Sequence, residues 1–281
     1  MKHFDIHVHF NLDDAAKIEF FVKTCREDET FAAMSGGLRY GGHDYLPNEQ
    51  VLAWCRKYSD CLVPMAKLDL WDKTDVEQVY RYAESGFKGF KCIYPYFAYD
   101  DDAYMPVYEA VEKCGLPMLF HTGCFFQSAG DAVWRRPVLR NMDPVCLDRI
   151  ARSFPKARIV MAHLGTSVWR HEAAELIKFH PNLFADLAGT GSWKALSPGE
   201  LNALMLPLLA TSPADAHRNM AKLVLGSDAY IDYPHLVGDA RRGYEHLLDA
   251  NGVPPEIRRG VLGATAASWF GIELEFCKIQ W

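Results

Sequence analysis

Two histidines near the start of the chain have the spacing of neighbouring metal ligands. From residue 4 to residue 10 polar and apolar residues alternate, with Asp5, His7 and His9 as the polar set. This period of two is typical of a strand whose two faces differ. His7 and His9 then share one face, roughly 6–7 Å apart. Two imidazoles at that spacing can bind one divalent cation, although two surface histidines on an edge strand would give the same triplet.

Three more residues of the same kind end apolar runs further along the chain: His121, His163 and Asp228. Alone, each is more typical of a hydrogen-bonded histidine, a turn residue or a helix cap. Together with His7 and His9, however, they end four different predicted strands. If those strands are parallel, their carboxyl ends meet, and the coincidence favours one shared site.

The residue types in this set fit one kind of chemistry. Neutral imidazoles and a carboxylate suit zinc, manganese or iron with one position open to water. A divalent ion lowers the pKa of its water toward about 7. A neighbouring carboxylate can accept the proton, and a further histidine can stabilise a developing oxyanion.

Strands and amphipathic helices alternate along the whole chain. The predicted strands are residues 3–9, 30–34, 61–68, 87–93, 116–121, 158–163, 183–188 and 223–228. The predicted helices are residues 14–26, 48–57, 74–84, 103–114, 144–153, 170–178, 199–209, 214–220, 236–250 and 254–268. Eight such units predict a (β/α)8 (TIM) barrel with its active site at the carboxyl ends of the strands. A doubly wound open sheet is the alternative, but no Gly-x-Gly-x-x-Gly follows a predicted strand.

The length fits two small domains or one α/β barrel, and we expect a single domain, residues 1–281. No linker rich in Pro, Gly or Ser divides the 281 residues, and the net charge of −6 argues against nucleic acid or an anionic membrane as partner. No apolar run approaches the ~18 residues of a membrane span, and the first residues do not resemble a signal peptide. We therefore expect a cytoplasmic protein with a small-molecule substrate; a homo-oligomer stays open. The eight cysteines include no C-x-x-C pair and are expected to be reduced.

The motifs resemble a known family. They are Asp5-Ile6-His7-Val8-His9, Gly86-Phe87-Lys88-Gly89-Phe90-Lys91, Leu119-Phe120-His121-Thr122-Gly123, Ala162-His163-Leu164-Gly165 and Gly226-Ser227-Asp228, with a closing stretch at 261–271. They resemble the amidohydrolase superfamily, and most closely its amidohydrolase-related (amidohydrolase 2) branch, which includes aminocarboxymuconate-semialdehyde decarboxylase. The resemblance implies that one divalent metal, zinc first and manganese as the alternative, is bound by His7, His9, His121 and Asp228. It also implies that His163 is either catalytic or a histidine that supports a metal ligand. We expect Asp228 to be the general acid/base as well as a ligand, and His163 to stabilise the oxyanion.

Lys91 leaves the number of metal ions open. In two-metal members of the superfamily a carboxylated lysine on the fourth strand bridges the ions, and His163 would then bind the second ion. In the amidohydrolase-related branch the site usually holds one ion, and a plain Lys91 would instead bind a substrate carboxylate or carbonyl. We favour one metal.

Two further candidates for substrate contacts come from predicted loops. Tyr94 follows the fourth strand and either lines a pocket or packs loops. Arg136 lies in the long loop after the fifth strand and either clamps a carboxylate or is a surface charge.

We expect hydrolysis, in which a metal-activated water attacks an amide, ester or lactone carbonyl of a small, carboxylate-bearing substrate. Some decarboxylases of the branch carry Glu in place of the first histidine of His-x-His, so His7 fits a hydrolase while excluding neither reaction. The alternative is non-oxidative decarboxylation of an unsaturated or aromatic acid. A non-catalytic barrel with structural histidines is the third reading.

Overall fold

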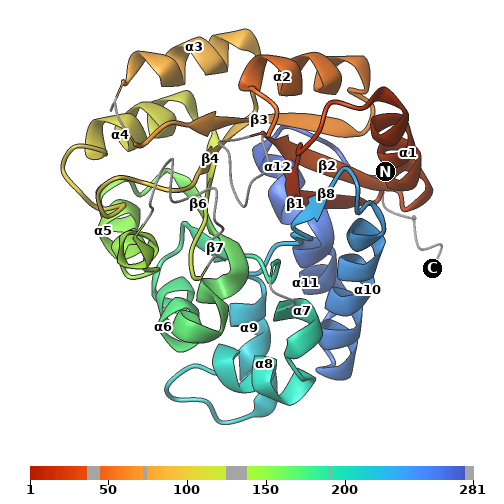
Figure 1. Ribbon diagram of the computed structural model, residues 1–281. Helices are drawn as coiled ribbons and strands as arrows, with labels where there is room; N and C mark the ends of the chain where they lie inside the picture. Colours follow the sequence, from red (N-terminus) through yellow and green to blue (C-terminus); the bar gives the residue numbers. More distant parts are fainter. Residues whose placement is uncertain (37–44, 72–74, 125–137, 190–191, 276–281) are drawn as a thin grey trace.

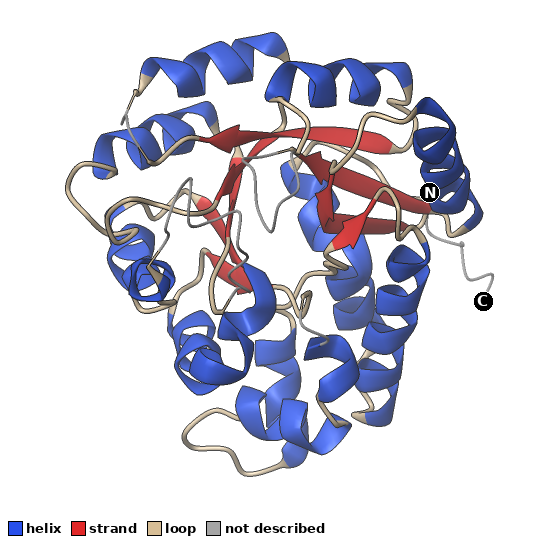
Figure 2. Ribbon diagram, in the orientation of Figure 1, coloured by secondary structure: helices blue, strands red, loops and turns tan. Residues whose placement is uncertain are grey.

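A computed structural model describes residues 1–36, 45–71, 75–124, 138–189 and 192–275. Within them, eight parallel strands form one curled sheet, which helices surround (Figures 1 and 2). The strands are β1 (His3–His9), β2 (Thr30–Ser35), β3 (Leu62–Leu68), β4 (Gly89–Cys92), β5 (Pro117–Phe120), β6 (Arg158–Met161), β7 (Leu183–Ala185) and β8 (Ala229–Tyr230). They are ordered β7-β6-β5-β4-β3-β2-β1-β8, so each of β1 to β7 pairs with its neighbour in sequence. The predicted (β/α)8 barrel is confirmed.

The segment 222–228 closes the ring of strands between β7 and β1. On one side, the backbone N–H of Val224 donates to the carbonyl of Ala185 at 2.9 Å. On the other side, Ile6 donates to the carbonyl of Leu225 at 2.9 Å, and Asp228 donates to that of His7 at 2.8 Å. The ring is therefore continuous in hydrogen bonds even where regular strand geometry is absent.

The eighth strand was predicted at residues 223–228, but regular pairing with β1 begins only at Ala229. Two features interrupt the extended backbone before it. Gly226 lies so close to Asp186 that an added Cβ would be 2.8 Å from the Cβ of Asp186, and Asp228 has a left-handed φ of 60°. The predicted strand therefore forms as an irregular connection whose end is turned toward the barrel mouth.

The helices follow the predicted order. They are α1 (Ala15–Glu27), α2 (Asn48–Lys57), α3 (Glu77–Ser85), α4 (Met105–Cys114), α5 (Cys146–Ser153), α6 (Thr166–Phe179), α7 (Ser192–Ala195), α8 (Pro198–Met205), α9 (His217–Met220), α10 (His235–Ala250), α11 (Pro255–Arg259) and α12 (Thr265–Trp269). Asp14 caps α1 by accepting a hydrogen bond from the N–H of Lys17, and α4 ends at Gly115 in the left-handed conformation. No helix in these ranges is long and apolar enough to cross a membrane.

The first strand departs from simple alternation. Its register with β2 shifts between Asp5 and Val8. Ile6 packs in the barrel interior, whereas Val8 packs against the outer helices. The expectation that Asp5 shares a face with His7 and His9 is therefore wrong. A β-bulge re-aims side chains without ending the strand, and here it leaves Ile6 in the core while both histidines reach the mouth.

Apolar side chains fill the barrel below the mouth. The cluster consists of Phe4, Ile6, Ala33, Val63, Met65, Leu119, Val160, Ala162 and Val224, with Ala266, Ala267 and Phe270 from α12 and the residue after it. All of these side chains are buried. A filled interior gives the polar groups above it a fixed and largely dry floor.

Candidate metal-binding site

Three ligand atoms meet at the mouth of the barrel: the Nε2 atoms of His7 and His9 and one carboxylate oxygen of Asp228. The two nitrogens are 3.2 Å apart, and the Oδ1 of Asp228 lies 2.9 Å from His9 and 3.4 Å from His7. In a tetrahedral site with bonds of about 2.0–2.1 Å, ligand atoms are separated by roughly 3.3 Å. The triangle therefore has the size that a zinc-like ion requires.

The other ring nitrogens of the two histidines turn away from this triangle toward acceptors. His7 Nδ1 lies 2.9 Å from the Oδ2 of Asp186, and His9 Nδ1 lies 3.4 Å from the Oγ of Ser35. The Ser35 hydroxyl itself donates to the carbonyl of Val8 at 3.3 Å and so accepts from His9. Such outer partners are what orient metal-binding histidines.

Burial favours the neutral form of three histidines of the site. Burial lowers the pKa of His7, His9 and His121, and the positive charge of Lys91 lowers it further at each ring. Two neutral rings whose Nε2 atoms point at each other cannot both donate, so a cation between them would satisfy both lone pairs. The donor set and its protonation therefore fit a divalent metal ion.

The carboxylate of Asp228 is ionised. Burial alone would raise its pKa, but the neighbouring rings of His7, His9 and His163 outweigh burial and hold that pKa well below its usual range. An ionised carboxylate can bind a cation with one oxygen and offer the other oxygen as a proton acceptor.

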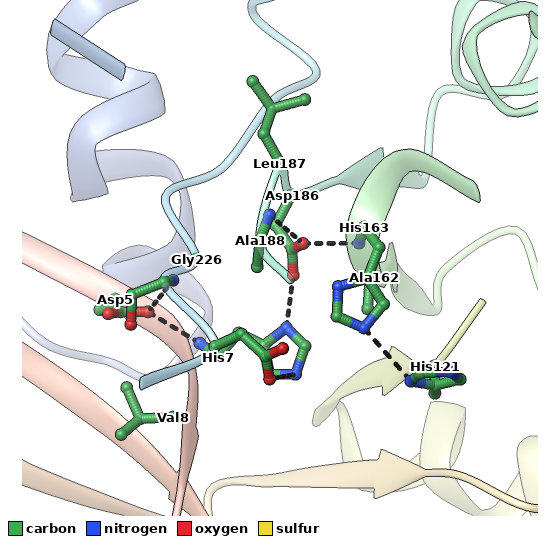
Figure 3. A network of polar contacts seen from close by, with 12 residues as sticks. Asp5, His7, Val8, His121, Ala162, His163, Asp186, Leu187, Ala188 and Gly226 are labelled. Atoms are coloured by element: carbon green, nitrogen blue, oxygen red, sulfur yellow. Dashed lines mark hydrogen bonds and ion pairs between the residues drawn. The ribbon is translucent and has the colours of Figure 1, made fainter. Parts of the chain in front are cut away.

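His163 and His121 form a second part of the site. His163 Nε2 lies 3.2 Å from His121 Nδ1, and the ring of His163 is 5.1 Å from that of His7 between centroids (Figure 3). His163, His7 and Asp186 make a second group of potential metal ligands. Of the four predicted ligands, three therefore form the triangle, while His121 lies beside His163.

Lys91 is fully buried and faces the triangle. Its Nζ lies 2.7 Å from the Nε2 of His7. Burial lowers the pKa of this lysine to about 8, although the carboxylates of Asp228 and Asp186 raise it. A buried amine whose pKa lies near neutrality is typical of a functional position.

The two predicted loop contacts differ in outcome. Tyr94 is buried, and its ring lies 6.1 Å from that of His121 between centroids. It therefore borders the site. Arg136 lies outside the residues that the structure describes.

Asp186 belongs to the site, although it is not among the site residues predicted from the sequence. It directly follows β7, is fully buried, and accepts from His7 Nδ1 and from the backbone N–H of His163 (Figure 3). Burial raises the pKa of its carboxyl group. The signal was present, because Leu-Phe-Ala-Asp ends an apolar run in the same way as the other site segments.

The backbone is strained around the site. Six non-glycine residues of the described chain have a left-handed φ, and five of them follow β4, β6 or the segment before β8: Tyr94, His163, Leu164, Thr166 and Asp228. Such conformations cost about 1–3 kcal/mol each and cluster at functional sites. Here they turn the chain sharply at the strand ends, so that side chains face the mouth.

Gly189 provides a test of how tightly the site is packed. An added Cβ would lie 2.3 Å from Nδ1 of His163 and 3.0 Å from Oδ2 of Asp228. We expect Gly189→Ala to displace the His163 ring and to reduce activity severely. Gly115→Ala is the control, because Gly115 is also left-handed (φ 67°) but a Cβ there meets nothing within 4 Å. Both changes should cost about 1–2 kcal/mol of unfolding free energy from the backbone alone. Urea unfolding and activity assays of both variants test this prediction. Equal activity in Gly189→Ala and Gly115→Ala would contradict it.

Comparison with known proteins agrees with the fold and the motifs. A model of the family described as amidohydrolase matches residues 4–272. Curated proteins give no match. A TIM-barrel protein from Bordetella bronchiseptica is 14% identical with a TM-score of 0.67, over 96% of this chain and 100% of its own.

Two further solved structures are described as enzymes. One is a probable 2-pyrone-4,6-dicarboxylic acid hydrolase from Acinetobacter baumannii with citric acid bound (14% identity, TM-score 0.60, 97% of this chain and 100% of that one). The other is 2,6-dihydroxybenzoate decarboxylase from Rhizobium (14% identity, TM-score 0.62, 96% and 98%). At such identities these structures share the fold with this chain, and nothing finer follows from them.

Proposed function

We propose a reaction for this chain, which belongs to the amidohydrolase family: metal-dependent hydrolysis of an amide, ester or lactone in a small, carboxylate-bearing substrate. The observation that carries the proposal is the triangle of His7 Nε2, His9 Nε2 and Asp228 Oδ1, with sides of 2.9 to 3.4 Å. We propose zinc as the ion, with manganese as the alternative, because imidazole and carboxylate donors suit both.

When bound, such an ion lowers the pKa of a water molecule and polarises a carbonyl group. In our proposal His7, His9 and Asp228 hold it. His121, whose buried ring lies next to His163, is the fourth ligand in the proposal.

The chain's own groups then divide the remaining work. The ionised carboxylate of Asp228 accepts a proton from the attacking water and returns it to the leaving group. His163, beside His7, donates a hydrogen bond to the developing oxyanion. Lys91 attracts the substrate carboxylate or carbonyl, and Tyr94 borders the pocket near His121.

Decarboxylation of an unsaturated or aromatic acid is the second candidate. It uses the same residues, and the fold is shared both by a structure described as a hydrolase and by one described as a decarboxylase. The intact His-x-His pair fits a hydrolase, since some decarboxylases of the branch carry Glu at the first position, but it is compatible with both reactions.

Hydrolysis and decarboxylation can be separated by measuring ¹⁸O incorporation from water and the release of carbon dioxide. The metal-loaded protein is incubated in ¹⁸O-water with panels of carboxylate-bearing lactones, esters and amides, and of aromatic and unsaturated acids. Mass spectrometry then reads ¹⁸O in the product, and released carbon dioxide is measured in parallel. Hydrolysis places one ¹⁸O in the new carboxylate. Carbon dioxide release without ¹⁸O uptake by the organic product would replace hydrolysis by decarboxylation, and inactivity on both panels would favour a non-catalytic barrel.

A further inference from the structure

The carboxylate of Asp186 contacts two histidines of the site, the ring of His7 and the backbone of His163. Its Oδ2 accepts from the ring Nδ1 of His7 at 2.9 Å. Its Oδ1 accepts from the backbone N–H of His163 at 2.7 Å and from that of Ala188 at 2.9 Å. A single buried side chain therefore joins β1, β6 and the end of β7 (Figure 3).

At His7, Asp186 selects which ring nitrogen carries the proton. An ionised carboxylate only accepts hydrogen bonds, so Nδ1 must donate. On the other side of the ring, Lys91 Nζ lies 2.7 Å from Nε2, and an ammonium group only donates. Both neighbours thus demand the same tautomer, with the proton on Nδ1 and the lone pair on Nε2. That lone pair faces His9 and Asp228.

At His163, the same carboxylate holds a strained backbone. His163 has φ 68°, a conformation that costs a non-glycine residue free energy. The 2.7 Å hydrogen bond from its N–H to Asp186 compensates that cost and fixes the direction in which the ring leaves the chain.

We propose that Asp186 is a positioning residue that sets the ring tautomer of His7 and the turn at His163, and thereby the affinity of the site for a divalent ion. The part that concerns metal affinity rests on the proposed function, whereas the tautomer of His7 can be measured without metal. Asp186 acts through these two histidines and needs no contact with the substrate.

The competing explanation is that the Asp186 carboxylate only stabilises the fold. Asp5 provides the control for this explanation. Asp5 is also fully buried and also accepts from two backbone N–H groups, those of His7 at 3.0 Å and Ser227 at 3.1 Å. In the described residues it bonds to no imidazole nitrogen. Asp5→Asn therefore replaces a comparable buried carboxyl group while leaving the ring contact of His7 in place.

Asp186→Asn changes the ring contact. The amide has one acceptor oxygen, and two backbone N–H groups compete for it against one ring nitrogen. We expect the oxygen to stay with His163 and Ala188, so that the amide NH₂ faces Nδ1 of His7. The Nδ1 side then favours a proton on Nε2, where it blocks the lone pair, and only Lys91 still favours the Nδ1–H form.

The test measures two properties of the wild type, Asp186→Asn and Asp5→Asn. Long-range ¹H–¹⁵N spectra of the metal-free chains give the His7 tautomer, and competition with a chromophoric chelator gives the Kd for Zn²⁺. We expect the Nδ1–H form in the wild type and in Asp5→Asn, and a clearly larger share of the Nε2–H form in Asp186→Asn. The Kd should rise by about 10- to 100-fold in Asp186→Asn and change by less than about threefold in Asp5→Asn.

Several outcomes would overturn the proposal. An Nε2–H tautomer at His7 in the wild type does so even if Asp186→Asn fails to fold. An unchanged tautomer and Kd in Asp186→Asn, or an equal loss of affinity in Asp5→Asn, also does so. A wild type that binds no Zn²⁺ would instead remove the proposed function, while the spectra would still decide whether Asp186 sets the tautomer.

Discussion

Asp228→Asn is expected to lower kcat by about 10³-fold, within the 10²- to 10⁴-fold range of general acid–base catalysis. The amide keeps one oxygen that can remain near the ion. It has no negative charge and cannot accept the proton of the attacking water. The loss should therefore appear mainly in kcat, with a smaller effect on metal content.

The fold should survive this substitution. Asp228 has φ 60°, and asparagine is, like aspartate, among the non-glycine residues that adopt this conformation most readily. The backbone N–H of Asp228, which donates to the carbonyl of His7, is unchanged. Asp228→Ala would add backbone strain to the chemical change, so Asn is the cleaner variant.

Steady-state kinetics on the substrate found in the ¹⁸O experiment, with metal content and thermal melting in parallel, would check this prediction. Asp232→Asn is the matched control, because Asp232 lies just beyond β8 and its exposed carboxylate accepts a hydrogen bond from Asn11 at 2.8 Å. That variant should retain wild-type turnover. Wild-type turnover in Asp228→Asn itself would remove Asp228 from the mechanism.

The strand ends were predictable because strand periodicity and barrel topology act together. Once eight parallel strands are inferred, His9, His121 and His163 must end at the same rim, wherever they stand in the sequence. The family and the fold that these motifs indicated are both confirmed. This part of the site could therefore be predicted without knowing how the side chains are oriented.

The orientation of the side chains could not be predicted in the same way. The shift in register of β1 takes Asp5 off the face of His7, and period-two reasoning contains no signal for a bulge. The contact between Lys91 and His7 joins residues 84 positions apart, and that between His7 and Asp186 joins residues 179 apart. Asp186 was overlooked because an aspartate after a strand is usually a cap or turn residue, and its role depends on which strands become neighbours of β1.

Removal of the metal is the second prediction with a large effect. We expect a chelator to abolish turnover and to lower the melting temperature. The triangle of His7 Nε2, His9 Nε2 and Asp228 Oδ1, with sides of 2.9 to 3.4 Å, is in place to bind the ion in the folded chain, and an ion that binds only the folded chain stabilises it. An ion present at about 1,000 times its Kd stabilises the folded chain by about 4 kcal/mol. At about 2–4 °C per kcal/mol for a large domain, Tm should fall by roughly 10 °C.

Plasma mass spectrometry on protein purified without added metal or chelator, followed by melting with chelator and with added Zn²⁺ or Mn²⁺, tests this. His9→Ala should lose both the metal and the response of Tm, whereas His171→Ala, which changes an exposed histidine of α6, should keep both. About one ion per chain would support the set of His7, His9, His121 and Asp228, with Lys91 as a substrate contact. About two would make Lys91 a carboxylated bridge and His163 a ligand. No metal, even after supplementation, would leave the geometry of the triangle without its explanation, and the hydrolase proposal would fail with it.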